Sequence, residues 1–225
     1  MLKRLPILNT KDHFVEARQR IRDYGYDSLR KEHVLAGIAD EQHNLTTGFK
    51  PFNIFARLAG GVMAQKGMEE ANGYLGDDGE HFMVACNLPK NDEMWEDGTK
   101  EWLGKASMAK NHRFMLIRSL EWRWFNALVY GMRDDEDLDE AIELLEHMKR
   151  AALAFTRADK TTTWSEDPKK IGLYFHCYPH CSVNHTHLHI VDLSMAGPTH
   201  EHLRFKNLKL DDVIAVLKEE KAQRA

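Results

Sequence analysis

The most constraining feature of the sequence is an alternating run near its C-terminal end, His185-Thr186-His187-Leu188-His189-Ile190-Val191. Side chains in a β-strand point alternately to the two faces of a sheet. We therefore predict a strand over 184–193, with the three histidines on one face and the apolar side chains on the other. Seven of the thirteen histidines lie between residues 176 and 202. Any imidazole chemistry of this chain is expected there.

Three interpretations of the histidine run remain open from the residues alone. The three side chains form a surface ladder on an edge strand, they bind a metal ion, or they act on a substrate. Neutral imidazole is the commonest metal ligand, and a His-x-His pair on a strand is a frequent half of such a site. His176 and His180 are also four apart, as are Cys177 and Cys181, but in a strand and turn this spacing does not bring side chains together. We predict no metal site and no organic cofactor.

Hydrophobic periodicity outlines the rest of the chain. Asn9 or Thr10 is a candidate N-cap for a first helix whose apolar face includes Phe14 and Ile21. Further helices are predicted over 28–38, from about 51, over 136–155 and over 210–221, and strands over 81–87, 112–118 and 171–178. A strong turn signal at 76–79 separates the two patterns. The predicted fold class is α+β, an antiparallel sheet with flanking helices (80–225) preceded by a helical N-terminal extension (1–79).

Composition narrows the class of partner. The net charge of −4 does not suggest a binder of long nucleic acids, which would carry a strongly basic surface. The three cysteines, Cys86, Cys177 and Cys181, are too few for a secreted disulfide scaffold and fit a reducing compartment. The first eight residues have no apolar signal-peptide core, and no apolar run approaches the ~20 residues of a membrane span. We expect a cytoplasmic protein with no membrane partner.

The run from Ser182 to Ile190 resembles a known family. It aligns without gaps to the Ser-Val-x-His-x-His-Leu-His-Val signature of histidine triad nucleotide-binding proteins. Thr186 departs from the pattern, which prefers an apolar residue there, and Cys181 stands where many members carry glutamine. The resemblance implies a histidine-triad (HIT-like) fold, a small nucleotide as substrate and a homodimer.

A second resemblance points to one branch of that superfamily. Residues 116–122 are similar to a strand end of scavenger mRNA decapping enzymes, and Gly131-Met132-Arg133 and Ala196-Gly197-Pro198 are similar to two later segments. The aspartate and lysine that hold the cap in those enzymes align with Ser119 and Glu121. Because a carboxylate repels a polyphosphate, we expect cap structures to be poor substrates.

The resemblance assigns roles to residues of the site. It makes His187 the nucleophile on a nucleotide α-phosphate, with its ring held by the carbonyl of His185 and with His189 contacting a phosphate oxygen. The substrate contacts that we predict are Ser182, His180, Asn184 and Arg118, with His180 replacing an upstream family histidine that the sequence lacks. The five tryptophans are more often packing residues than base-stacking platforms, and Trp95, in a polar loop, is the one to test for contact with a base.

The predicted function is therefore that of a histidine-triad nucleotide hydrolase, which forms a nucleotidyl-histidine intermediate. Nucleotidyl transfer is the less favoured reaction. Two other classes remain as alternatives: a metal-dependent enzyme that uses His185, His187 and His189 as ligands, and a nucleotide-binding protein without turnover.

Overall fold

The computed structural model describes residues 7–224 and shows a mixed α+β chain, which confirms the predicted fold class. Its five strands form one antiparallel sheet in the order β1-β2-β4-β3-β5. The strands are β1 (Phe82–Ala85), β2 (His112–Ile117), β3 (Ile171–Phe175), β4 (His187–Asp192) and β5 (Leu208–Lys209). The helices are α1 (Lys11–Tyr24), α2 (Tyr26–Leu35), α3 (Ile54–Ala59), α4 (Glu69–Gly73), α5 (Pro89–Glu93), α6 (Asp135–Ala158), α7 (Pro198–His202) and α8 (Leu210–Arg224).

The capping signals in the sequence mark true helix ends. The Thr10 hydroxyl accepts a hydrogen bond from the backbone N–H of His13 at 3.3 Å, so Thr10 rather than Asn9 caps α1. Asp134 caps α6 in the same way through the N–H of Asp137 at 2.7 Å. The predicted helix over 136–155 therefore lies entirely within α6. The turn signal at 76–79 falls in a short 3-10 helix, Gly76–Glu80.

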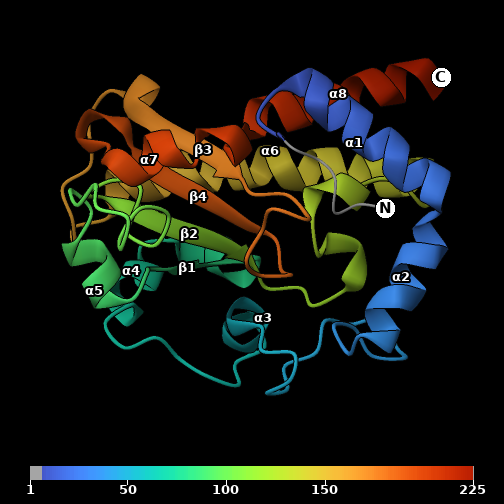
Figure 1. Ribbon diagram of the computed structural model, residues 1–225, viewed down its shortest axis with the longest axis horizontal. Coiled ribbons are helices and arrows are strands. Elements are labelled where there is room, and N and C mark those ends of the chain that lie inside the picture. Colours follow the sequence, from blue (N-terminus) through green and yellow to red (C-terminus); the bar gives the residue numbers. More distant parts are fainter. Residues whose placement is uncertain (1–6, 225) are drawn as a thin grey trace.

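One face of the sheet packs against the long helix α6, and the other face carries His187 and His189. Leu188 and Ile190 of β4 join the large core that α6 also supplies, with Leu145 and Phe155. His187 and His189 point to the other face, where α3 packs against β2 (Figure 1). The predicted alternation of faces is thus correct from residue 187 onward.

The predicted strand over 184–193 begins too early, because β4 starts at His187. The residue opposite His187 is Leu116, one residue before β2 ends, so 184–186 have no partner strand on that side. The backbone before His187 instead bends and makes local contacts. His185 consequently does not lie in the strand, which corrects the predicted ladder of three.

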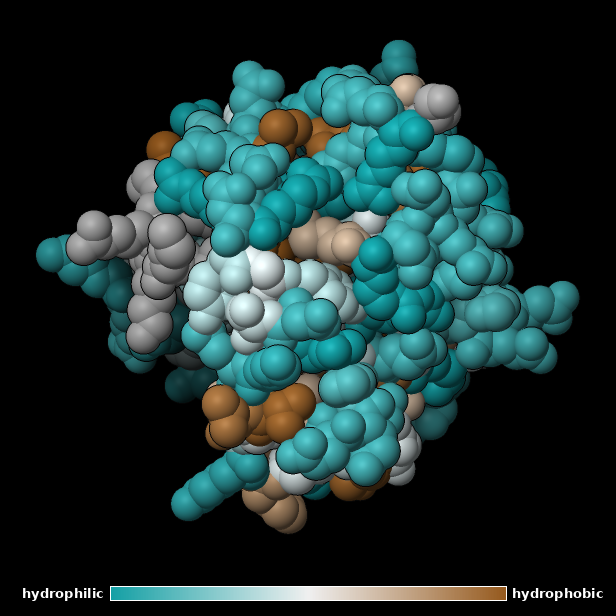
Figure 2. Space-filling view, turned by 90° about the vertical axis from the view of Figure 1, so that its right-hand side faces the viewer, coloured by the Kyte–Doolittle hydropathy of each residue, from teal (hydrophilic) through white to brown (hydrophobic). Residues whose placement is uncertain are grey.

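Helices from both ends of the chain pack together. α1 contacts α8, and α8 contacts α6 (Figure 1). Phe14 and Leu29, before residue 79, belong to the same core cluster as Leu145 and Val213, after it. The division into 1–79 and 80–225 stays a prediction. The end of the molecule turned to the viewer in Figure 2 is mainly hydrophilic, with small hydrophobic patches. Among the described residues, none of the helices has the length and apolar character needed to span a membrane.

Candidate active site

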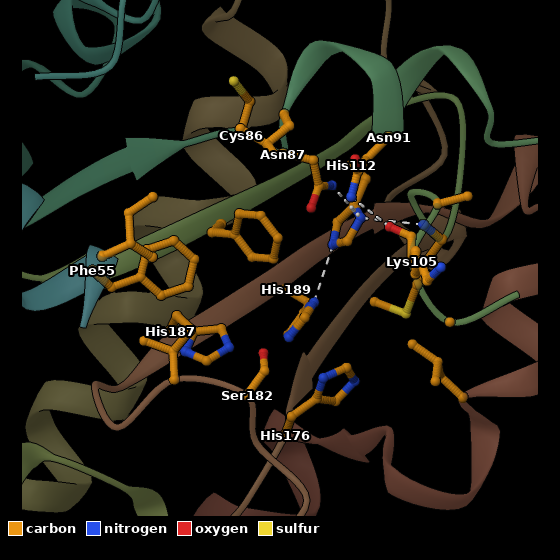
Figure 3. A pocket seen from close by; sticks show the side chains of 18 of the residues that line it. Phe55, Cys86, Asn87, Asn91, Lys105, His112, His176, Ser182, His187 and His189 are labelled. Atoms are coloured by element: carbon orange, nitrogen blue, oxygen red, sulfur yellow. Dashed lines mark hydrogen bonds between the residues drawn. The ribbon is translucent and has the colours of Figure 1, made fainter. Parts of the chain in front are cut away.

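A pocket of about 530 Å³ opens on the sheet face that carries His187 and His189 (Figure 3). It gathers four imidazoles from three strands or strand ends, together with two lysines and several apolar side chains. Its lining includes Phe55, Asn87, Asn91, Trp102, Lys105, His112, His176, Ser182, His187, His189 and Lys206. Within residues 7–224, no carboxylate lines this pocket.

One ring nitrogen of His187 is hydrogen-bonded to the backbone, and the other keeps a lone pair. Its Nδ1 lies 2.7 Å from the carbonyl oxygen of His185. A carbonyl only accepts hydrogen bonds, so Nδ1 carries the proton and Nε2 keeps a lone pair. Burial lowers the pKa of His187 to about 4, so the ring is neutral at pH 7. The ring also packs against Phe55 of α3, with centroids 4.7 Å apart.

His189 is hydrogen-bonded to a histidine from the neighbouring strand. Its Nδ1 lies 3.0 Å from Nε2 of His112, and the two rings are nearly parallel. The backbone N–H of Met108 donates to Nδ1 of His112 at 3.2 Å. His112 therefore carries its proton on Nε2 and donates it to His189. His189 must then hold its own proton on Nε2, an atom that is buried and has no hydrogen-bond partner.

Two further cationic or imidazole groups complete this end of the pocket. His176, at the end of β3, packs on His189 with ring centroids 3.9 Å apart, and its Nε2 contacts Oδ1 of Asn207 at 2.7 Å. Lys206 lines the same pocket, and burial lowers the pKa of its ammonium group. Its Nζ donates to the carbonyl of His180 at 3.3 Å.

The structure brings some of the predicted residues together and leaves others apart. His187, His189 and Ser182 line the pocket. The other four predicted residues, His185, Asn184, His180 and Arg118, do not line it. Nδ1 of His185 contacts the carbonyl of Thr186, and the carbonyl of Asn184 accepts a hydrogen bond from Asn53. The ring of His180 packs on Phe205, and Nε of Arg118 donates to the carbonyl of Gly79. Of these four, His185 still acts on the site, through its backbone carbonyl on His187. Trp102, and not Trp95, lines the pocket.

Sequence reasoning missed His112, His176, Lys206 and Phe55. A signal existed for His112, since it opens the predicted strand at 112–118 and shares the face of Phe114. It was weak, because the sequence does not say which strand lies next to β2. Phe55 is 132 positions from His187 in the numbering, and nothing local links the two.

The residues on which poor cap turnover was predicted lie elsewhere. The Glu121 carboxylate binds Nε of Arg123 at 2.7 Å and lines a separate cavity of about 190 Å³. The Ser119 hydroxyl accepts from the N–H of Glu121 at 3.3 Å. Neither faces the histidine pocket, so repulsion of a polyphosphate by Glu121 has no basis in the structure. The prediction that cap structures are poor substrates therefore loses this support and stays a prediction.

Within the described part of the chain, no group of three or more His, Cys, Asp or Glu side chains is arranged to hold a metal ion. Neither the pair His176 and His180 nor the pair Cys177 and Cys181 belongs to such a group.

Thr186, the departure from the family pattern, has a structural role. Its hydroxyl donates to the carbonyl of Trp124, and the buried hydroxyl of Tyr130 donates to it at 2.6 Å. These contacts attach the residue before His187 to the segment that follows β2. The polar residue is therefore matched to polar partners that an apolar side chain would leave unpaired.

We expect Thr186→Val to lower the free energy of unfolding by about 1–3 kcal/mol, because the buried Tyr130 hydroxyl loses its acceptor at 2.6 Å and keeps only the Trp124 carbonyl at 3.5 Å. Denaturant unfolding measures this. Thr99→Val is the matched control, since the Thr99 side chain is exposed and its loss should change stability little. Equal stability of the two variants would contradict the role given to Thr186.

One comparison with known proteins finds a relative. A family model described as "Scavenger mRNA decapping enzyme C-term binding" matches residues 132–204. A search of curated proteins and a search of solved structures match nothing. The matched range begins just before α6 and includes β3, β4 and the histidine run. It confirms the resemblance predicted from the sequence: over these residues the chain is similar to the C-terminal domain of scavenger mRNA decapping enzymes, within the histidine triad superfamily.

Proposed function

We propose that this protein is a nucleotide hydrolase of the histidine-triad type, in which His187 attacks the α-phosphorus of its substrate. The observation that carries the proposal is the fixed tautomer of His187, whose Nδ1 proton is held by the His185 carbonyl while Nε2 keeps its lone pair. A neutral imidazole is a competent nucleophile near pH 7. The family match over 132–204 supports a nucleotide as the substrate class.

The surroundings of His187 suit an anionic substrate. Lys206 and Lys105 line the pocket, and the lining described here contains no carboxylate. The Nε2–H of His189 is a buried donor without a partner. Such a donor stabilises the charge that develops on a non-bridging phosphate oxygen during attack. Ser182 lines the same pocket, which supports a contact with the phosphate or the leaving group.

The reaction has two steps. In the first, the Nε2 lone pair forms a bond to phosphorus, and the bond to the leaving group breaks with its electron pair on that group. The product is a nucleotidyl-histidine with Nδ1 still protonated. In the second, a water oxygen attacks phosphorus and His187 leaves as neutral imidazole. One proton of that water ends on the leaving group, so a nucleoside monophosphate and the protonated leaving group are released.

The family resemblance still predicts a homodimer.

We expect a covalent adduct on His187. Phosphorus–nitrogen bonds to imidazole are stable to alkali and labile to acid. A substrate labelled on its α-phosphate should therefore leave label on enzyme quenched in base and none on enzyme quenched in acid. Peptide mapping of the base-quenched enzyme should place the adduct on His187. An adduct on Ser182 or Cys181 would contradict the proposed nucleophile.

The substrate itself is best sought with a panel: an adenosine phosphoramidate, a diadenosine polyphosphate, a methylated cap dinucleotide and an adenylylated acceptor. Turnover of any of these, measured as kcat/KM, supports a hydrolase. Binding of all with turnover of none would favour the non-catalytic alternative.

A further inference from the structure

The ring nitrogen of His189 that carries the proton depends on hydrogen bonds that begin at residues outside the run His185–His189. We infer that Asn87 is a positioning residue that, together with the backbone N–H of Met108, sets the tautomer of His112 and, through His112, makes His189 a hydrogen-bond donor toward the pocket. The consequence for catalysis rests on the proposed function, but the tautomers themselves do not. Asn87 follows β1 and lines the pocket beside His112 (Figure 3).

The orientation of the Asn87 amide is fixed by its neighbours. Its nitrogen lies 3.3 Å from Oδ1 of Asp92 and 2.6 Å from the hydroxyl oxygen of Ser107. The Ser107 hydroxyl is itself hydrogen-bonded to Oδ1 of Asp92. A carboxylate only accepts, so Ser107 gives its proton to Asp92 and the Asn87 atom beside them must be the NH₂ group. The amide therefore presents donors, not its oxygen, to this cluster.

The same NH₂ group reaches His112. The Asn87 nitrogen lies 3.2 Å from Nδ1 of His112, the atom that also receives the Met108 backbone N–H at 3.2 Å. Two donors aimed at one ring nitrogen leave no room for a proton on it. Burial lowers the pKa of His112 to about 3, so the ring stays neutral and its single proton resides on Nε2.

The tautomer of His112 determines that of His189 through the 3.0 Å hydrogen bond between Nε2 of His112 and Nδ1 of His189. His112 donates from Nε2, so Nδ1 of His189 accepts and its Nε2 carries the proton. In the opposite tautomer, Nε2 of His189 would present a lone pair to an anionic phosphate, which repels it. Loss of one such donor typically costs about 10²–10³-fold in kcat.

The wild-type protein gives the first test. Nitrogen-15 NMR distinguishes a protonated from an unprotonated imidazole nitrogen. We expect the proton on Nε2 in His112 and His189 and on Nδ1 in His187. A proton on Nδ1 of His112 in the wild-type protein would overturn the inference, without the need for any variant or substrate.

The second test moves the carboxylate of the cluster without changing net charge. In the double variant Asn87→Asp with Asp92→Asn, a carboxylate replaces the donor that faces Nδ1 of His112. A charge-assisted hydrogen bond from a protonated Nδ1 to this carboxylate is stronger than the neutral contact from the Met108 N–H, which remains. We expect Nδ1 of His112 to become protonated, and kcat on the best substrate of the panel to fall about 10²–10³-fold with little change in KM. Unchanged histidine tautomers in a folded double variant would overturn the inference.

Asn91→Asp is the control for the effect of a nearby carboxylate. Asn91 lines the same pocket, but its amide donates to the carbonyl of Lys105 at 2.7 Å. This variant places a carboxylate nearby without replacing a contact to His112, so its His112 and His189 should keep their protons on Nε2. A tautomer change as large as that of the double variant would show a general charge effect and overturn the role of Asn87. If no substrate turns over, the NMR result still decides the inference, and the proposed function alone fails.

Discussion

Replacing His187 with asparagine is expected to lower kcat/KM by on the order of 10⁴-fold or more, since the reaction then has no nucleophile. Asparagine can still donate to the His185 carbonyl, so it keeps the local hydrogen bond while removing the attacking nitrogen. His187 is buried and packs on Phe55. We therefore also expect a loss of about 1–3 kcal/mol in the free energy of unfolding, which leaves the protein folded.

The control for this prediction is His147→Asn. His147 lies on α6, where its Nε2 contacts Oδ1 of Asp78 at 2.7 Å, and it does not line the histidine pocket. Its loss should leave kcat/KM within a few-fold of the wild-type value. A His187→Asn variant that keeps a tenth of the wild-type kcat/KM would rule out His187 as the nucleophile.

The second large effect concerns stability. Arg18 of α1 is fully buried, and it binds Glu220 of α8 through two hydrogen bonds of 2.8 and 2.7 Å. Its guanidinium also donates to the carbonyl of Leu128 at 3.0 Å. Glu220→Ala should lower the free energy of unfolding by about 3–5 kcal/mol, because it leaves a buried charge without its counter-ion. Thermal or denaturant unfolding measures the change.

Glu219→Ala is the neighbouring control. Glu219 pairs with Lys11 on the surface, where both side chains are largely exposed. Exposed pairs contribute about 0–1 kcal/mol, so this variant should lose far less stability than Glu220→Ala. Comparable losses in the two variants would contradict a buried ion pair between α1 and α8.

The same pair predicts a pH dependence. Burial opposes ionisation of Glu220, but the hydrogen bonds and charges of Arg18 and Arg22 outweigh it and lower the pKa of the carboxyl below its ordinary value of 4.5. A carboxyl with a lowered pKa in the folded state stabilises the fold above its unfolded pKa. That contribution is lost as the pH falls from about 4.5 through the folded pKa. Glu220→Gln should remove this part of the acid sensitivity.

The sequence by itself determined the local features of the fold and the centre of the site. The alternation of His187 to Val191 predicted a strand with two different faces, and both faces are as expected. A capping residue and apolar spacing predicted α1, and apolar spacing predicted α6. These features depend on side-chain direction and helix-end hydrogen bonds, which a few neighbouring residues decide. The resemblance over the histidine run was also local, and the match to residues 132–204 confirms it.

Only the tertiary structure decided which residues surround that centre. His112 lies beside His189 because β2 pairs with β4 in one register, and Phe55 reaches His187 because α3 packs on β2. The same register ends at Leu116 opposite His187, which leaves His185 outside the strand. Arg118 and Glu121 follow the end of β2 and contact other parts of the chain. Strand order and register depend on side chains far apart in sequence, and so the pattern of any one segment does not contain them.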